Sequence, residues 1–153
     1  FLGSDGGLGA KLSERRLYAD GELRLTHAFL PFFRYAPDLR PGIARVEAAF
    51  FERLERHEGL DTRACFDDQY ICSAGHLVLL MRGLYRFVAD LRPLVARREG
   101  KRSVPTKPYD LAGALVCARE VGVELTDLSG APLEFPLDVH TPVVYARCAN
   151  AAT

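Results

Sequence analysis

The sequence lacks an excess of charge of either sign. Its 153 residues include 20 Lys or Arg and 20 Asp or Glu, so the formal net charge is zero. Proteins that bind polyanions usually carry a basic surplus. The richest basic stretch, 92–102, also contains no aromatic side chains that could stack on bases. The composition therefore argues against binding to nucleic acid.

Long apolar runs are also missing. The longest candidate, 77–81, is far below the roughly 18 residues that a membrane span requires. The opening residues, FLGSDGG, have neither the basic segment nor the cleavage site of a secretory signal peptide. We therefore expect a cytoplasmic protein without membrane association. Because the chain also begins without Met, we expect it to be a fragment or a processed product.

Close pairs of metal-binding side chains are absent as well. The four cysteines form no C-x-x-C pair, and the four histidines show no metal-ligand spacing. Zinc sites usually need such pairs, so no thiolate site is predicted. We expect the cysteines to be reduced and buried. They are Cys65, Cys72, Cys117 and Cys148.

The residues that are present indicate one globular domain spanning 1–153. The composition is 48% hydrophobic and 26% charged, and a chain of this length buries roughly 70% of its unfolded surface. Apolar side chains at three- and four-residue spacing predict helices. Short apolar runs between turn residues predict strands. The charged stretch 92–106 predicts an exposed, solvated loop. A phosphate-sensing or subunit-contact role of its basic part is the alternative. The predicted helices are 42–57, 73–83 with Ser73 as N-cap, and 108–121; the predicted strands are 11–18, 22–28, 64–70, 87–91, 123–128 and 142–148. Their alternation predicts a layered mixed α/β fold.

The segment 107–114, KPYDLAGA, has a chemical pattern of its own. Pro108 suits the start of a helix, where its missing N–H costs little. Asp110 then falls in the first helical turn, where a carboxylate is favoured by the helix dipole and can also face a ligand. The small residues 112–114 let a substrate or another backbone approach closely. On spacing alone, an ordinary acidic residue at a helix N-terminus is the simpler interpretation.

The last third of the chain resembles the inositol monophosphatase family. Residues 108–116, followed by Glu120, Gly122, Thr126-Asp127 and Gly130, are similar to the family's W-D-x-A-[AG]-G, E-A-G-G and T-D-x-x-G series. Asn150 closes a match to its A-A-N. A weaker upstream match starts at 72–75, similar to G-[ST]-A-A, and continues at 87–92, similar to G-x-x-D-A-Y/F and the acidic residue after it.

The resemblance implies the C-terminal half of a layered sandwich with a mixed sheet flanked by helices. It implies a phosphatase for inositol monophosphate or a related small sugar or nucleotide phosphate. Asp110 would be a ligand of catalytic Mg²⁺, and Asp90, Ser73 and Ala74 would contact the substrate. A phosphate monoester needs Mg²⁺ to neutralise its oxygens and activate a water. We assign no residue a direct catalytic role.

Three departures limit what this chain can do. Tyr109 replaces the family's Trp, and Val121 and Val123 replace the Ala and Gly of E-A-G-G. More importantly, the G-E-E and D-P-[IL]-D-G-[ST] segments, which supply most magnesium ligands in the family, are absent. A single carboxylate from Asp110 cannot organise an octahedral two-metal site. The alternative is a non-catalytic α/β scaffold or interaction domain. As a half-domain, the chain is expected to self-associate or form a homodimer through exposed apolar surface.

Overall fold

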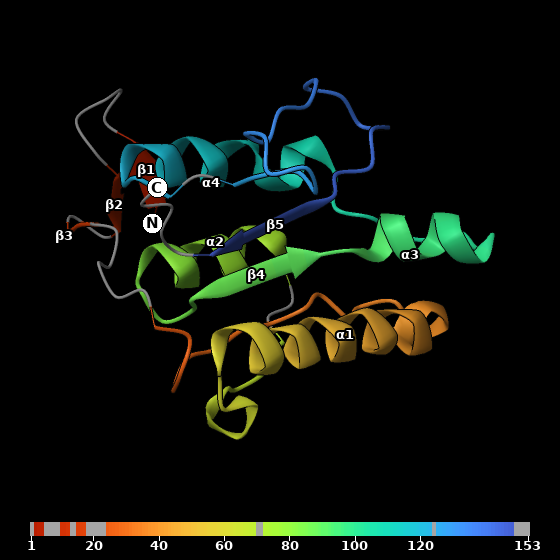
Figure 1. Cartoon of the computed structure of the whole chain (residues 1–153). Coiled ribbons are helices and arrows are strands. Elements are labelled where there is room, and N and C mark those ends of the chain that lie inside the picture. The colour runs from red at the N-terminus through yellow and green to blue at the C-terminus, as the bar shows by residue number, and fades with distance from the viewer. Residues whose placement is uncertain are drawn as a thin grey trace.

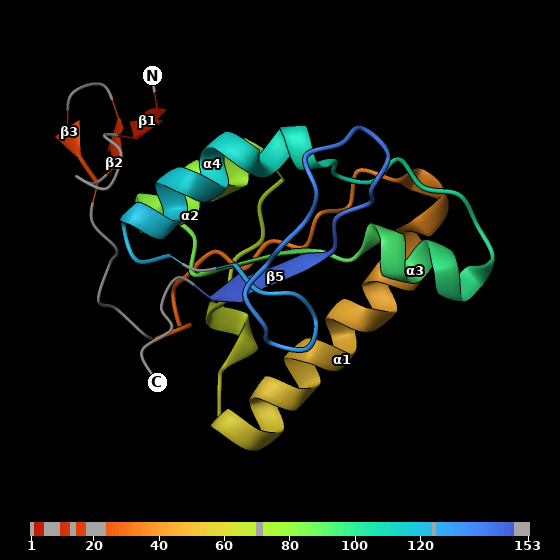
Figure 2. The same ribbon diagram turned by 90° about the horizontal axis from the view of Figure 1, so that it is seen from above.

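A computed structural model describes residues 2–4, 10–12, 15–17, 24–69, 72–123 and 125–148. A sheet lies between two layers of helices (Figures 1 and 2). Helices α2 and α4 cover one face of strands β4 and β5, and α1 covers the other, with α3 leading away from the end of β4. The main elements are α1 (Arg40–Glu58), α2 (Ser73–Met81), β4 (Phe87–Asp90), α3 (Arg92–Glu99), α4 (Pro108–Glu120) and β5 (Tyr145–Cys148). This confirms the predicted layered mixed α/β fold.

The sheet is mixed, as predicted. Strands β4 and β5 are antiparallel, with Asp90 opposite Tyr145. Parallel bridges join Phe29 to Tyr85 and Phe32 to Ala89, so an extended segment runs beside β4. On the side of β5 that faces away from β4, Thr126 pairs antiparallel with Ala146. A separate antiparallel sheet of β1 (Leu2–Ser4), β2 (Ala10–Leu12) and β3 (Arg15–Arg16) lies against α4.

Apolar burial on both faces of the sheet holds the layers together. On one face, Leu77 of α2 and Leu111 of α4 pack with Tyr145 of β5. On the other, Ile43 of α1 and Val95 of α3 belong to the second cluster. A Cβ added at Gly42 would lie 2.4 Å from Val95 Cγ1, so α1 approaches α3 too closely there for a larger residue. The two clusters fix β4 between α2, α4 and α1.

Three predicted helices are confirmed as α1, α2 and α4. Leu77, Leu80 and Met81 of α2 face the core as expected. Gly59 ends α1 with φ of 64°, a left-handed conformation that glycine adopts without steric cost. The predicted N-cap of α2 was wrong: Cys72 is the N-cap, its Sγ accepting from Gly75 N at 3.2 Å. Ser73 is instead the first helical residue.

The other predicted elements differ in extent or type. Residues 92–99 form helix α3 rather than a loop, with a proline in its first turn and Gly100 at its end. In the described residues of the predicted strands 64–70 and 123–128, only Phe66 and Thr126 form bridges. Residues 24–28 have no strand and turn at 26–27. Cys72 is exposed, contrary to the prediction, whereas Cys117 is buried and Cys65 is half-buried. Residues 13–14, 18, 22–23, 70, 124 and 149–150, which also carried predictions, lie outside the described residues.

No helix in the described part of the chain is both long and apolar enough to cross a bilayer.

Candidate functional site

The start of α4 places Asp110 in the first helical turn, as the sequence predicts. Its Oδ2 accepts a hydrogen bond from Lys107 N at 2.9 Å, which satisfies a backbone donor at the helix N-terminus. The residue is exposed, so its carboxylate also faces solvent. Lys107 Nζ donates to His140 O at 2.6 Å and ties the loop 136–142 to the same end of α4. Asp110 is therefore a helix-capping residue that remains accessible to a ligand.

Asp90, at the end of β4, is fully buried and forms an ion pair with Arg92. Arg92 Nε donates to Asp90 Oδ1 at 2.9 Å, and Arg92 Nη2 donates to Oδ2 at 2.7 Å. This bidentate geometry is the strongest form of arginine–carboxylate contact. The guanidinium also lies over the Phe33 ring, 3.9 Å from its centroid. The two charges thus neutralise each other inside the protein.

The remaining donors and acceptors of these two side chains are also satisfied. Arg92 Nη1 donates to Val104 O at 2.9 Å and to Tyr35 O at 3.3 Å. Thr106 Oγ1 donates to Asp90 Oδ2 at 2.6 Å. Buried charges are costly unless they are paired and hydrogen-bonded, and this pair has both kinds of partner. The ion pair therefore joins the end of β4 to the segments around Tyr35 and Val104.

Ser73 extends the buried network from Thr106 to the start of α2. The two hydroxyl oxygens are 2.6 Å apart, and both residues are buried. Ala74 is half-buried and packs against the core shared by α2 and α4. Tyr145 is completely buried nearby, and this burial raises the pKa of its phenol. The network thus connects the N-terminus of α2 with the residues that precede α4.

The predicted site residues therefore fall into two environments. Asp90, Ser73 and Ala74 lie in or beside the buried region, whereas Asp110 is exposed above it at the start of α4. Both oxygens of Asp90 already accept hydrogen bonds, so a substrate hydroxyl would reach this carboxylate only by displacing Arg92 or Thr106. Contact of Asp90, Ser73 and Ala74 with a substrate stays a prediction.

Two members of the network, Arg92 and Thr106, were missed by sequence reasoning. Arg92 was assigned to an exposed basic segment, but it is buried. The available signal was its position two residues after the buried acid Asp90, at the first residue of a helix. Thr106 carries no comparable signal, because its partners lie 16 and 33 residues away in the sequence.

His76 is buried between aromatic rings on the α2 side of the sheet. Its ring centroid lies 5.1 Å from that of Phe33 and 5.8 Å from that of Tyr85. Burial lowers the pKa of His76 to about 4, and the negative charges of Asp90 and Asp68 only partly oppose this effect. The imidazole is therefore neutral at physiological pH and acts as a core residue.

The carboxylates of the described residues do not fit a magnesium site. No group of three or more His, Cys, Asp or Glu side chains in these residues is arranged to hold a metal ion. Asp138 and Asp127 are used locally: Asp138 accepts from His140 N and Thr141 N, and Asp127 accepts from Ser129 N and Ala131 N. Magnesium requires near-octahedral oxygen coordination, which Asp110 alone cannot provide, so its role as a metal ligand stays a prediction.

Comparison with solved structures finds this fold in inositol monophosphatases. The chain is similar to a staphylococcal inositol monophosphatase II with bound 2′-AMP, with 20% identity over 95% of this chain and 46% of that one, at a TM-score of 0.61. It is also similar to an inositol monophosphatase from Anabaena, with 20% identity over 95% of this chain and 47% of that one, at a TM-score of 0.59.

A third structure, an inositol monophosphatase from Thermotoga maritima, matches with 18% identity over 95% of this chain and 45% of its own, at a TM-score of 0.61. The staphylococcal protein has also been solved with inositol monophosphate; that match has 22% identity over 83% of this chain and 40% of the other, at a TM-score of 0.54. No protein-family model matches the sequence, and no curated protein sequence does.

These likenesses show a shared fold. The chain spans slightly less than half the length of the staphylococcal, Anabaena and Thermotoga structures, which agrees with the prediction of a half-length match.

Proposed function

We propose that this chain is the substrate-side, C-terminal half of a Mg²⁺-dependent phosphomonoesterase. Its substrate would be inositol monophosphate or a related small sugar or nucleotide phosphate. The proposal is carried by the match of 95% of the chain to 46% of a phosphatase-fold structure that holds 2′-AMP. Inositol monophosphate, bound in another structure of that protein, is likewise a phosphate monoester. We propose a cytoplasmic enzyme.

In this proposal, Asp110 supplies one carboxylate to Mg²⁺, and the other ligands come from segments outside this chain. Asp110 is suited to this role because it is exposed and held in place by its hydrogen bond from Lys107 N. The buried network of Asp90, Arg92 and Thr106 would fix the end of β4 to the segment that leads into α4. It would thereby position the first turn of α4, which carries Asp110. Bound Mg²⁺ would neutralise phosphate oxygens and activate water.

Self-association is proposed from apolar side chains at the surface. Phe29 and Phe66 are 38% and 46% exposed, and their ring centroids are 5.7 Å apart. Adjacent exposed aromatic side chains favour burial against a partner. The partner would be a second copy of the chain in a homodimer or the remaining half of the phosphatase fold.

The test is release of inorganic phosphate from inositol monophosphate and 2′-AMP by the full-length protein that carries this chain. We expect activity with Mg²⁺ and none with a chelator. The variant Asp110→Asn should lose at least about tenfold in rate, because loss of a metal ligand costs no less than loss of an outer-shell partner. Asp127→Asn is the matched control and should keep its activity, since Asp127 caps a turn away from α4. Equal activity of Asp110→Asn and the parent would remove Asp110 from the metal site.

A second candidate function is a non-catalytic scaffold derived from this fold. It is favoured by one observation: the carboxylate that would contact substrate, Asp90, is closed off by Arg92 and Thr106. The same assay separates the two functions. Under the scaffold hypothesis, the full-length protein releases no phosphate from either substrate at any Mg²⁺ concentration.

A further inference from the structure

A groove with a volume of about 390 Å³ lies between helices α1 and α3. The two helices lie side by side where α1 begins and α3 ends (Figures 1 and 2). On each helix the lining residues follow the first one by three, four or seven positions, so they share one face. They are Gly42, Arg45, Val46 and Ala49 of α1 and Val95, Arg98 and Glu99 of α3, and all lie within the described ranges.

The floor of the groove is apolar. Val46 is half-buried and packs against the cluster that contains Val95, so the floor is continuous with the core on the α1 face of the sheet. Ala49 is exposed and contributes only a methyl group. The space beside Val46 is therefore not filled by the protein's own side chains. An apolar group that entered it would be removed from water, which is favourable.

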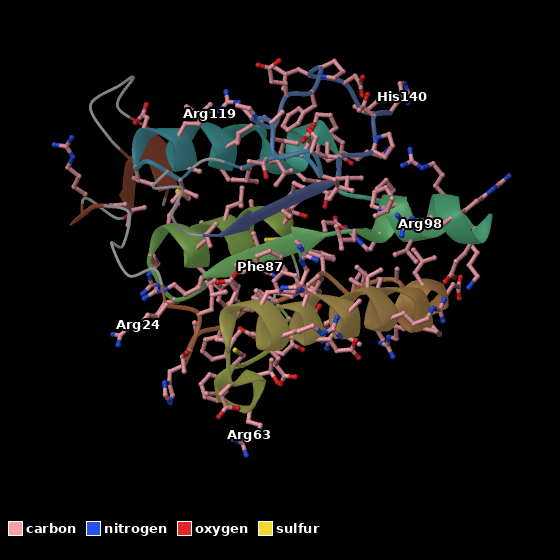
Figure 3. All side chains as sticks on the ribbon, viewed as in Figure 1. Arg24, Arg63, Phe87, Arg98, Arg119 and His140 are labelled. Atoms are coloured by element: carbon pink, nitrogen blue, oxygen red, sulfur yellow. The ribbon has the colours of Figure 1, made fainter. Side chains whose placement is uncertain are left out.

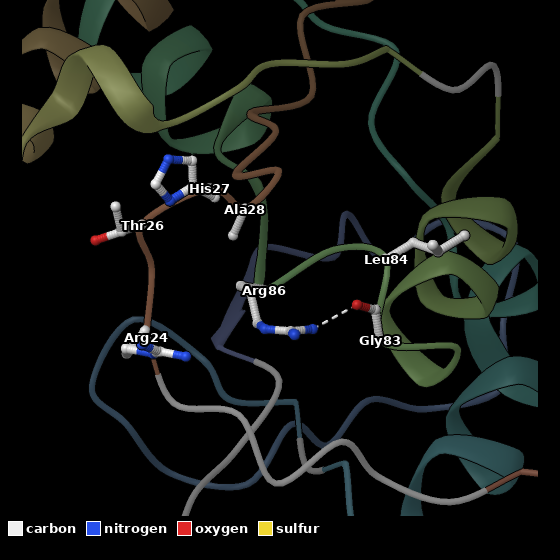
Figure 4. A pocket seen from close by; sticks show the side chains of 7 residues that line it. All are labelled: Arg24, Thr26, His27, Ala28, Gly83, Leu84 and Arg86. Carbon is white, nitrogen blue, oxygen red and sulfur yellow. Dashed lines mark hydrogen bonds between the residues drawn. The ribbon is translucent and has the colours of Figure 1, made fainter.

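Cationic side chains flank this floor. Arg45 and Arg98 line the groove from its two helices, and both residues are exposed. Figure 3 shows Arg98 and Arg24 on opposite sides of the molecule. The groove is therefore separate from the cavity at the turn before β4, which Arg24 lines (Figure 4). An arginine fork matches the oxygens of a carboxylate, and the arginine stem can cover apolar surface.

Glu99 is the acidic residue of the lining, and its carboxylate is already engaged. Its Oε1 accepts from Arg45 Nη2 at 2.5 Å, and its Oε2 accepts from Lys101 Nζ at 2.7 Å. The hydrogen bond from Lys101 and the nearby charge of Arg45 lower the pKa of Glu99. The Arg98 side chain makes no ion pair or hydrogen bond with the described residues. The guanidinium of Arg98 is therefore available to an anion from outside.

The size and charge of the groove indicate the class of ligand. Its volume falls within the range of roughly 300–1,000 Å³ that is typical of small-molecule sites. The other acidic residues of this part of α1, Glu47 and Glu52, do not belong to the lining, and Glu47 pairs with Arg34. The rim thus carries a net positive charge beside an apolar floor. This combination is complementary to a small molecule with an apolar body and an anionic head.

We propose that the groove between α1 and α3 binds a small amphipathic carboxylate. The carboxylate pairs with the guanidinium of Arg98, and the apolar body lies on Val46 and Ala49. The observations that carry the proposal are the apolar floor, the available guanidinium beside it and the engagement of Glu99 by Arg45 and Lys101. The site does not depend on the proposed phosphatase activity.

The test is titration of the chain with decanoate, below the concentration at which decanoate forms micelles. Calorimetry measures the affinity, and NMR shifts of the amides in 42–49 and 95–99 locate the site. Arg98→Ala should weaken binding about tenfold or more, because hydrogen bonds to charged groups are among the stronger ones. Arg56→Ala, at an exposed position of α1 outside the groove, is the charge-matched control and should bind as the parent does.

A second pair of variants tests the apolar floor. Ala49→Glu places a carboxylate in the groove and should abolish binding, whereas Ala48→Glu, the same change at an exposed neighbour outside the lining, should preserve it. The proposal is overturned if the cation decyltrimethylammonium binds as tightly as decanoate, or if the members of either variant pair bind equally well. Shifted amides elsewhere, or binding only to micelles or to anionic lipid vesicles, would overturn it as well.

Discussion

The two ends of β4 carry charged side chains in different surroundings. At the Asp90 end, Arg92 and Asp90 form a buried bidentate pair whose remaining donors and acceptors bond to Thr106, Val104 and Tyr35. At the other end, Arg24 is exposed and Arg86 is half-buried, and both line a cavity at the turn that leads into β4. At the Asp90 end, neutralisation by Arg92 compensates the burial of the carboxylate and closes it to a ligand. Burial of a charged residue alone therefore does not identify a ligand site.

The largest expected effect is on the Asp90 end of this comparison. Arg92→Ala would leave Asp90 buried without its counter-charge, which typically costs 3–5 kcal/mol in the free energy of unfolding, so we expect a loss of about this size. Denaturant unfolding followed by circular dichroism measures it. Arg63→Ala is the matched control, because its ion pair with Asp61 is exposed and screened by solvent, and its loss should be much smaller. Equal losses of unfolding free energy in the two variants would contradict the claim that the buried ion pair of Asp90 and Arg92 stabilises the fold.

The next effect is a pH dependence that arises from His76. Its pKa in the folded protein is about 4, below the unfolded value of about 6.5, so the unfolded state binds more protons between these pH values. Stability from the neutral imidazole is therefore complete above about pH 6.5 and falls as the pH drops towards 4, by up to about 3 kcal/mol.

Unfolding free energies measured across this pH range test the effect. The variant His76→Phe should flatten the slope, whereas His57→Gln, at an exposed position of α1, should keep it. A slope unaffected by His76→Phe would show that another group titrates.

A smaller effect is expected at Thr106, which links Asp90 to Ser73. Thr106→Val keeps the shape and removes the hydroxyl, so Asp90 and Arg92 each lose one hydrogen bond and Ser73 loses its contact with Thr106. We expect a loss of about 1–3 kcal/mol. Thr106→Ser, which retains the hydroxyl, should recover most of it in the same unfolding experiment. Failure of the serine variant to recover stability would assign the effect to the methyl group instead.

Much of the fold could be predicted because its signals are local. The spacing of Ile43, Val46, Phe50 and Leu54 predicts α1, and Leu77, Leu80 and Met81 predict the inner face of α2. Pro108, Asp110 and Gly122 likewise mark the ends of α4. These patterns involve residues that are close in the sequence, so they can be recognised without knowledge of the fold.

The misses involve contacts between distant segments. Helix α3 is short and polar, and one of its three buried residues is the charged Arg92. Its sequence therefore shows no apolar periodicity that would predict a helix. Residues 64–70 are apolar enough for a strand, but Asp61 caps a 3₁₀ turn at 62–64 and leaves only the bridge at Phe66. The position of Asp110 could be predicted, because Pro108 and an acidic side chain are typical of a helix start. The blocking of Asp90 by Arg92 and Thr106 could not, because the contact with Thr106 forms only when the chain folds.

The proposed metal site is tested most directly with Mn²⁺, a paramagnetic substitute for Mg²⁺ that also prefers carboxylate ligands. Mn²⁺ is added to the isotopically labelled full-length protein. If Asp110 is a metal ligand, the amide signals of residues 108–111 broaden at low Mn²⁺ and those of 83–86 do not, and Asp110→Asn removes the broadening. Signals around 108–111 that stay sharp in the parent, or broadening that persists in Asp110→Asn, would contradict the proposed metal-dependent phosphatase half.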